Sequence, residues 1–386
     1  MKVLIITDNY SLEKVGGKYY HRALDYHIKA YSYLGEIRLC LPLKHTISIK
    51  REINLNNINV SEIQKENTII KRFIFNKNRH IIKHEVKNSD IIIGFSPSSV
   101  CDRAIKYAKK YDKTFVSVVI SCVWDGLWNH SLRGKILAPY SFLKTRNTIL
   151  KSDYAIYVTD KFLQQRYPCN GVSIGVSDVI IPSLDIKILN DRLDYYDSKL
   201  NFKNLRIATV AAVDVRYKGQ EDVIKAMKIL AEQGYNIQYV LIGGGDTSYL
   251  RNVAKKYGMI NNLQFVGAIP HEKIFDMLKD IDIYIQPSKQ EGLPRSVVEA
   301  MSQALPILCA NTGGMPELVD ATCIFNRGNI LDIVKHIQKF ASKDRLKVES
   351  VKNFENSKRF QENVLRKKRN DFLLQILRDY MAKNQK

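Results

Sequence analysis

The chain has 386 residues, 45% of them hydrophobic and 26% charged, and carries a formal net charge of +21. Its length favours two domains, and no run approaches the roughly 18 consecutive apolar residues that a membrane-spanning helix needs. The six cysteines lie far apart without a CxxC pair, which argues against both a disulfide framework and a zinc site.

The first half of the chain predicts alternating strands and helices. The opening MKVLIITDNY has one lysine and a short apolar run before an aspartate, so it predicts a strand rather than a signal peptide, and we expect a cytosolic protein. Gly16 and Gly17 follow, and we expect them in a loop just before a helix that begins KYYHRAL. Apolar, β-branched runs predict strands at 3–7, 37–43, 90–96, 114–121 and 154–159.

The second half alternates more clearly, and between the halves lies a polar, acidic stretch without a clear strand. We place the interdomain linker there, at 191–204, between domains at 1–190 and 205–360. A basic segment with helical spacing, 361–386, ends the chain. Buried parallel strands are expected at 206–213, 237–245, 263–269, 281–288, 305–312 and 322–326, with amphipathic helices between them. This pattern predicts a doubly wound α/β domain whose ligand lies beyond the carboxyl ends of the strands.

The stretch PSKQEGLPRSVVEAM ends a predicted strand and begins a predicted helix. Gly292 allows the backbone to turn, and Pro294 suits the start of a helix, so a helix N-terminus is expected at the carboxyl end of the strand, where an anion is favoured. Glu299, within the helix, offers two oxygens to a vicinal diol, and Glu291 can reach a polyhydroxylated group beside a phosphate. The alternative is that Glu299 is a solvated helix residue and Glu291 an ordinary loop residue.

Two further loops follow predicted strands. In VDVRYKGQED, Arg216 and Lys218 stand where cations neutralise a leaving diphosphate, although a surface pair of this kind is common. In LIGGGD, Gly243 begins a triple glycine that either admits a ligand or makes a tight turn, and it matches neither GxGxxG nor a P-loop. The DID at 280–282 lies at the start of a strand, so we interpret it as structural rather than as a metal site.

Taken together, these stretches resemble a known family. RYKGQEDVIKAM, VLIGGG, FVGAIPHEKI and DIYIQPSKQEGLPRSVVEAMSQALPILCANTGGMPELV are similar, in this order, to glycosyltransferase family 4 (glycosyl transferases group 1). The resemblance is strong over about 205–320, and the first half resembles, more loosely, the members that build bacterial capsule, exopolysaccharide or O-antigen. It implies the GT-B fold, in which two Rossmann-like doubly wound domains face a cleft.

The resemblance also implies roles for single residues. Glu299 would grip the ribose hydroxyls of a nucleotide sugar, Glu291 would contact the transferred sugar, and Lys218 would bind the diphosphate. Other donor-binding positions carried over from the family are Gly16, Gly17, Gly243, Val266, Gly267, Gly292, Leu293 and Arg295.

The chain departs from the family pattern at two places. The family usually has an arginine within a GRL segment about five residues before the lysine, whereas this chain reads AAV at 211–213, and Arg216 is the candidate replacement. Many members place a histidine beside the reacting sugar, where this chain reads SCVWDGLWNH. Asp125 or His130 is the candidate there, with Trp124 beside them on the acceptor side.

The resemblance implies a retaining, metal-independent hexosyltransferase without a cofactor, which uses a UDP-sugar or, as second choice, a GDP-sugar and a lipid-linked or saccharide acceptor. A retaining glycosidase needs two carboxylates about 5 Å apart, and no such pair is evident, so we expect same-face substitution at the sugar. Catalysis would then rest on Lys218, Arg216 and a helix N-terminus stabilising the departing diphosphate, with Glu291 and Asp125 beside the reacting groups. A nucleotide-sugar epimerase of the same fold is the alternative enzyme.

The positive charge lies at the two ends of the chain. Residues 1–150 hold 25 basic and 12 acidic side chains, residues 351–386 hold 10 and 4, and residues 151–350 hold 25 and 23. A basic nucleic-acid-binding protein is the other alternative, but no binding motif supports it and we expect no nucleic-acid partner.

If the last helix packs on the first domain, the acceptor lobe is basic, which favours an anionic membrane and a peripheral location on the inner face of the cell membrane. The candidate contact is the helix RGKILAPYSFLKTRNTILK, through Lys135, Lys144, Arg146 and Lys151 among apolar residues. The alternative is a core helix with a solvated basic face.

Overall fold

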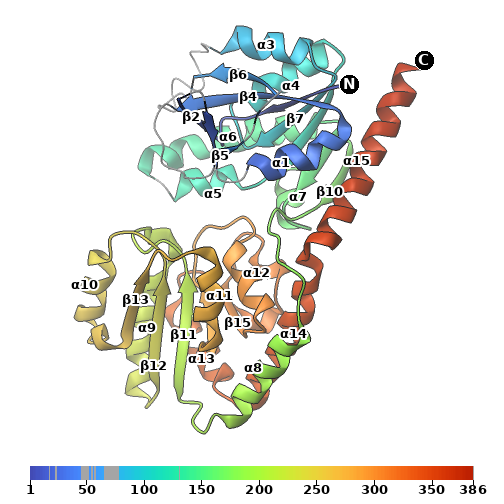
Figure 1. Cartoon of the computed structure of the whole chain (residues 1–386). Coiled ribbons are helices and arrows are strands. Elements are labelled where there is room, and N and C mark those ends of the chain that lie inside the picture. Colours follow the sequence, from blue (N-terminus) through green and yellow to red (C-terminus); the bar gives the residue numbers. More distant parts are fainter. Residues whose placement is uncertain are drawn as a thin grey trace. The chain divides into compact units, whose positions relative to one another are not determined.

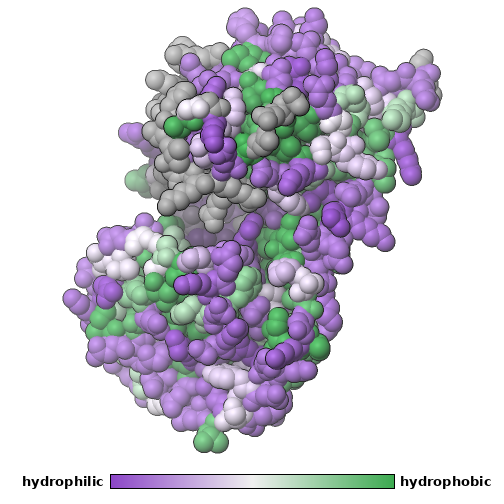
Figure 2. Space-filling view, viewed as in Figure 1, coloured by the Kyte–Doolittle hydropathy of each residue, from purple (hydrophilic) through white to green (hydrophobic). Residues whose placement is uncertain are grey.

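The computed structural model describes residues 1–16, 18–21, 24–44, 52–53, 55, 58–64, 78–129 and 131–385. The chain forms two compact units (Figure 1). Unit 1 comprises Met1–Val176 and Arg366–Lys386, and unit 2 comprises Ser177–Leu365. Hydrophilic residues cover most of the visible face in Figure 2. Among the described helices, none combines the length and the hydropathy needed to cross a bilayer.

Unit 2 is built on a parallel sheet in the order β13-β12-β11-β14-β15-β16. Helices α9, α10 and α13 pack together, as do α11, α12 and α14, and they cover the two sides of the sheet (Figure 1). The predicted doubly wound α/β domain is therefore confirmed. Its elements are α8 Ile186–Ser198, β11 Asn204–Val210, α9 Gln220–Glu232, β12 Asn236–Ile242, α10 Ser248–Lys256, β13 Leu263–Gly267, α11 His271–Lys279, β14 Ile283–Gln286, α12 Arg295–Ser302, β15 Ile307–Ala310, β16 Ile324–Phe325, α13 Ile330–Phe340 and α14 Lys343–Ser357.

Unit 1 is also a mainly parallel α/β unit, with its strands in the order β10-β9-β8-β7-β1-β4-β2-β3-β5 and β6 beside β4. Only β3, within the described residues, pairs antiparallel with its neighbours. Its elements are β1 Lys2–Ile6, β2 Leu12–Val15, β3 Lys18–Tyr20, α1 Leu24–Tyr31, β4 Glu36–Lys44, β5 Glu52–Ile53, β6 Asn59–Ile63, α3 Arg79–Lys87, β7 Ile91–Ser96, α4 Cys101–Lys110, β8 Thr114–Val119, α5 Val123–Trp128, α6 Leu132–Leu150, β9 Tyr154–Tyr157, α7 Phe162–Arg166 and β10 Val172–Gly175.

The division between the units differs from the one expected at 191–204. It falls after Val176, and most of the stretch taken for a linker forms α8 within unit 2. Arg192 of α8 is buried and donates hydrogen bonds to the main-chain oxygens of Leu278 (2.9 Å) and Ile281 (2.6 Å). These bonds satisfy carbonyl groups at the end of α11, so α8 is a packed part of the unit rather than a connection.

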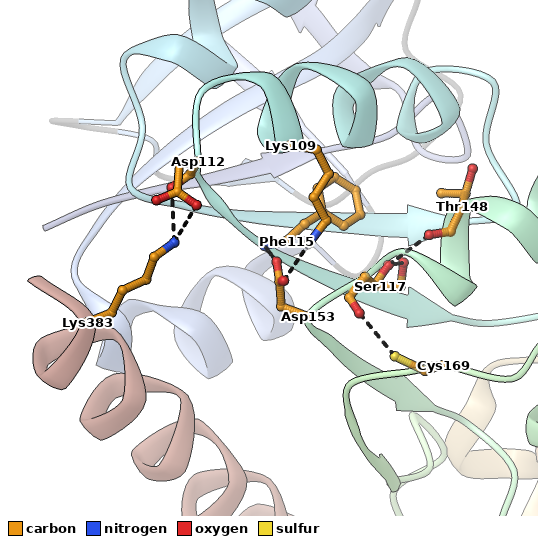
Figure 3. Close-up of polar contacts among 9 residues, drawn as sticks. Lys109, Asp112, Phe115, Ser117, Thr148, Asp153, Cys169 and Lys383 are labelled. Carbon is orange, nitrogen blue, oxygen red and sulfur yellow. Dashed lines mark hydrogen bonds and ion pairs between the residues drawn. The ribbon is translucent and has the colours of Figure 1, made fainter.

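The last helix, α15 Glu362–Asn384, completes unit 1 from residue 366 onward. Its apolar residues Phe372, Leu373 and Ile376 are buried. Tyr154 on β9 donates a hydrogen bond to Asp379 (2.7 Å). Lys383 forms an ion pair with Asp112 (2.6 Å between Nζ and Oδ1) (Figure 3). Both chain ends therefore contribute to one core.

A second set of contacts fixes the turns between strands of unit 1. The Asp153 carboxylate, just before β9, accepts hydrogen bonds from the main-chain nitrogen of Phe115 (2.9 Å) and from Lys109 (2.5 Å) (Figure 3). The Cys169 thiol donates to the main-chain oxygen of Ser152. All six cysteines are free thiols, and burial raises the pKa of Cys169.

A buried histidine makes the stability of unit 1 depend on pH. His27 on α1 stacks on Tyr10, with ring centroids 5.5 Å apart, and meets the edge of Phe95 at 4.7 Å. Burial, followed by the positive charges of Arg369 and His21, lowers the pKa of His27 from 6.5 to about 4. Because the fold favours the neutral ring, this contribution is complete above pH 6.5 and is lost as the pH falls towards 4.

We therefore expect the free energy of unfolding to fall between pH 7 and pH 4, with roughly 2–3 kcal/mol of that loss due to His27. His27→Phe keeps a ring in the stack without a titrating group, so urea unfolding at several pH values should show a shallower loss for this variant. His80→Asn, at an exposed histidine of α3, is the control. Parallel pH profiles for wild type and His27→Phe would contradict this assignment.

Candidate functional site

The site in unit 2 lies where the strand order of its sheet reverses. β11 pairs with β12 on one side and with β14 on the other, so consecutive connections leave β11 in opposite directions. The loops after β11 (211–219) and after β14 (287–294) thus begin at the carboxyl ends of neighbouring strands. Such a switch point is the usual ligand position in an open α/β sheet.

An ion pair joins these two loops. Lys218 Nζ lies 2.8 Å from Glu291 Oε1, and Gln286 Nε2 donates to the same oxygen at 3.1 Å. Both side chains of the ion pair are largely buried. The negative charge of Glu291 is therefore compensated and its position fixed by two donors.

A buried tyrosine fixes Gln286 in turn. The Tyr284 hydroxyl accepts a hydrogen bond from the main-chain nitrogen of Val210 (3.2 Å) and donates one to Gln286 Oε1 (2.7 Å). Burial raises the pKa of Tyr284, which keeps the hydroxyl protonated and able to donate. This chain of bonds links the ends of β11 and β14 to the Glu291 carboxylate.

Two glycines allow the loops to approach each other closely. Gly219 has φ +77°, and a Cβ atom there would lie 2.2 Å from the main-chain oxygen of Pro287. Gly313, after β15, has φ +59°, and its Cβ would lie 2.2 Å from the main-chain oxygen of Glu291. Gly314 also donates from its main-chain nitrogen to Gly292 (2.7 Å). A third loop thus supports the backbone that carries Glu291.

The second glutamate has a partner that the sequence did not reveal. Glu299 on α12 is only 3% exposed, and its Oε1 lies 2.7 Å from Nε2 of His271. His271 is the first residue of α11, and its ring meets the edge of Phe275. The sequence around His271, FVGAIPHEKI, does not predict this contact, because the contact depends on how α11 and α12 pack against each other. Glu299 is thus neither exposed nor solvated.

The other donor-binding positions expected in unit 2 lie at the ends of β12 and β13 and at the start of α12. Gly243 follows β12, and its main-chain nitrogen donates to the oxygen of Gly267 (3.0 Å), so the ends of β12 and β13 meet there. Val266 precedes Gly267 on β13, Gly292 and Leu293 are partly exposed in the loop before α12, and Arg295 is the exposed first residue of that helix.

Arg216 lies apart from the ion pair. It is exposed, and its guanidinium stands 4.3 Å from the ring centroid of Tyr249, a cation–π contact, whereas Lys218 points to Glu291. The structure therefore brings Lys218, Glu291 and Gln286 together and directs Arg216 to α10. Its role as the replacement for the missing family arginine stays a prediction.

In unit 1, the expected glycine loop has a different structure. Gly16 does not precede a helix: it lies in the turn between β2 and β3, with φ +56°, because Lys18–Tyr20 forms a strand paired antiparallel with β2. The helix expected from KYYHRAL begins only at Leu24. Gly17 lies outside the described residues.

The residues expected on the acceptor side lie on α5 and α6. Trp124 stacks on Trp128, with ring centroids 5.3 Å apart, and Asp125 is buried in the same helix. Lys144 forms an ion pair with Asp102 at 3.4 Å, and Arg146 donates to the main-chain oxygen of Arg166 (3.2 Å). Lys151, just after α6, is exposed, and His130 lies outside the described residues.

Metal-binding side chains do not cluster in the described part of the chain: no three His, Cys, Asp or Glu residues gather there in a suitable group. Asp282 of the DID segment lies before β14, at the end of the strand opposite the site. Its carboxylate accepts hydrogen bonds from Lys199 (3.1 Å) and from the main-chain nitrogen of Arg206 (2.7 Å). These are structural partners.

The profile described as "Glycosyl transferases group 1" matches residues 194–363, which include every site element of unit 2. The chain is also 32% identical to Protein CapJ of Staphylococcus aureus over 277 residues, which cover 71% of this chain and 68% of that protein. The chain belongs to the glycosyl transferases group 1 family. The amylovoran biosynthesis glycosyltransferase AmsK of Erwinia amylovora is 34% identical over 123 residues, about 30% of each chain.

Solved structures confirm the fold. Anabaena Alr3699/HepE in complex with UDP superposes with a TM-score of 0.67 at 13% identity, over 97% of this chain and 100% of that one. Sucrose-phosphate synthase from Thermosynechococcus elongatus gives 0.68 at 14% identity, over 98% and 99%. The chain has the expected GT-B fold of two Rossmann-like domains.

The Gly313 contact generates a prediction about this loop. Gly313→Ala should lower the free energy of unfolding by about 1–3 kcal/mol more than Gly258→Ala. Both glycines have positive φ (+59° and +69°), but an added Cβ meets Glu291 only at Gly313 and meets nothing within 4 Å at Gly258. Urea unfolding of both variants measures the difference. Equal losses of unfolding free energy in the two variants would contradict the prediction, because they would mean that the loop after β14 shifts to accommodate the added Cβ atom without an energetic penalty.

Proposed function

We propose that the protein is a retaining hexosyltransferase that moves a sugar from a nucleoside-diphosphate sugar, UDP favoured over GDP, to a lipid-linked or saccharide acceptor in the synthesis of a bacterial surface polysaccharide. Relatives named for amylovoran and colanic acid biosynthesis support the polysaccharide. Fold neighbours solved with UDP and with UDP-glucose support the donor class.

The observation that carries this proposal is the arrangement of Lys218, Glu291 and Glu299 at the switch point of unit 2. Glu299 would accept hydrogen bonds from the ribose diol, and Lys218 would bind the diphosphate as a cation. Glu291 would accept from hydroxyl groups of the sugar. Gly292, Leu293 and Arg295 lead into α12, whose N-terminus adds main-chain N–H donors for a phosphate or the sugar.

The ion pair also bears on the chemistry. A carboxylate that accepts from both Lys218 and Gln286 is a weak nucleophile, because its charge is already compensated. This supports same-face substitution over a covalent intermediate on Glu291. The bond from the anomeric carbon to the diphosphate breaks, the acceptor oxygen bonds to the same face of that carbon, and the departing diphosphate takes the acceptor proton. Lys218 would stabilise the charge that develops on the leaving diphosphate, without a metal ion.

The acceptor is proposed to be carried by a lipid at an anionic membrane surface, with the protein on the inner face of the membrane. The excess of basic residues in 1–150 and 351–386 supports this, because much of both segments belongs to unit 1. Trp124 and Asp125 of α5 would contribute to acceptor binding.

Calorimetric titration with UDP, GDP and ADP tests the donor site. One diphosphate should bind at micromolar strength, and Glu299→Gln should weaken it about 10- to 100-fold, because a charged acceptor for the ribose hydroxyls is lost. Glu355→Gln, at an exposed glutamate of α14, should bind like wild type. Unchanged affinity for Glu299→Gln, or no binding of any diphosphate to wild type, would contradict the proposed donor site.

His271 gives a second prediction about the same pocket. His271→Ala should weaken the bound diphosphate about 3- to 10-fold, because Glu299 loses the group that orients its carboxylate. The loss should largely disappear in the Glu299→Gln background, since His271 acts through Glu299. His336→Ala, a change on α13, is the control. Additive losses in the double variant would show that His271 acts independently of Glu299.

A further inference from the structure

Helix α6 of unit 1 exposes a line of large apolar side chains. Leu132 is 79% exposed, Ile136 80%, Tyr140 53% and Leu143 64%. Their spacing of four, four and three residues places them on one face of the helix. They extend about 17 Å along the axis. Isolated exposed apolar residues are ordinary, but a continuous line of them marks an interaction surface.

Small residues make up most of the buried face of α6. Gly134, Ala138, Ser141, Thr145 and Thr148 face the unit, and Gly134 lies so close to α5 that a Cβ atom there would be 2.1 Å from the main-chain oxygen of Leu127. A usual amphipathic helix turns its large apolar residues inward. In α6 only some do so: Ile149 is buried, and Phe142 packs against Trp124 and Tyr167, whereas Leu132, Ile136, Tyr140 and Leu143 stay exposed and do not contribute to that core.

The charges around this face have one sign. Residues 132–150 contain no aspartate or glutamate. Arg133 and Lys135 are exposed beside the apolar line, and Lys135 Nζ lies 5.7 Å from the ring centroid of Trp128. Trp128 itself is 42% exposed on α5, which packs against α6. A partly exposed tryptophan next to cations is typical of a protein at a membrane interface.

This surface differs from the one expected from the sequence. Lys144 and Arg146 are held by Asp102 and by the main-chain oxygen of Arg166. The exposed face of α6 is apolar along its centre, rather than a solvated basic face. Of the expected cations, Lys135 is exposed beside the apolar line, and Arg133 is exposed there as well.

We propose that this face of α6, together with Trp128, docks onto an anionic lipid bilayer, with Leu132, Ile136, Tyr140 and Leu143 inserted at the boundary between head groups and acyl chains. An apolar line with flanking cations and no acidic residue is complementary to an anionic bilayer surface. The helix lies in the plane of the interface. This inference rests on the proposed function for the lipid-linked acceptor, and it identifies the surface that brings the protein to such an acceptor.

Vesicle co-sedimentation tests the proposal with the full chain. Wild type should bind vesicles of equal parts phosphatidylglycerol and phosphatidylcholine, and Ile136→Ser/Tyr140→Ser/Leu143→Ser should reduce the partition coefficient about tenfold or more. The control is Leu331→Ser, at a 60% exposed leucine of α13. Arg133→Gln/Lys135→Gln should reduce binding to the anionic vesicles and remove its dependence on salt. Circular dichroism confirms that each variant is folded.

Two outcomes would overturn the proposal: wild type that does not bind the anionic vesicles, or a triple variant that binds them as well as wild type. If wild type instead forms a dimer that the triple variant abolishes, and no vesicles bind, the face is an interface between two copies. Titration of wild type and of the triple variant with UDP, GDP and ADP separates this test from the proposed function. A wild type that binds nucleotide but no vesicles rejects the membrane surface alone, whereas a wild type that binds vesicles but no nucleotide rejects the donor site alone.

Discussion

The ion pair between Lys218 and Glu291 exists only because β11 and β14 are neighbours in the sheet of unit 2. Each residue lies in a loop that leaves the carboxyl end of one of these strands, and the two loops can touch because Gly219 has no side chain where it meets Pro287. Gly313, in the loop after β15, lets that third loop approach Glu291 in the same way. The ion pair therefore depends on the strand order and on the backbone conformation of the loops together. The donor site proposed for this glycosyltransferase depends on all three.

The sequence predicted unit 2 well because buried parallel strands appear as continuous β-branched runs. It missed α8, since Arg192 and Tyr196 look like residues of a polar linker and their partners, Ile281 and Asp282, lie more than 80 residues further along the chain. It also misplaced Gly16, because β2 and β3 are short and half-exposed, and nothing in the pattern separates such a hairpin from a loop before a helix.

The positions of Lys218, Glu291 and Glu299 at strand ends and a helix start were also predictable, but their partners were not. The contact of His271 with Glu299 and the stacking of Arg216 on Tyr249 join residues from different helices or loops, so they depend on tertiary packing. For α6, helical spacing alone did not decide which face is buried. The close approach of Gly134 to α5 decides it, and that approach depends on tertiary packing.

Helix α15 has a consequence for how the protein is made. Residues 366–385 leave the ribosome after all of residues 177–365, yet Phe372, Leu373 and Ile376 belong to the core of unit 1. Unit 2 is therefore complete in sequence before unit 1 is, although unit 1 is begun first. During synthesis the surface of β9 that receives α15 stays uncovered while about 190 further residues emerge, at ordinary elongation rates a delay of roughly 10–40 s. A nascent chain of this protein thus presents an apolar surface to chaperones for about half of its translation.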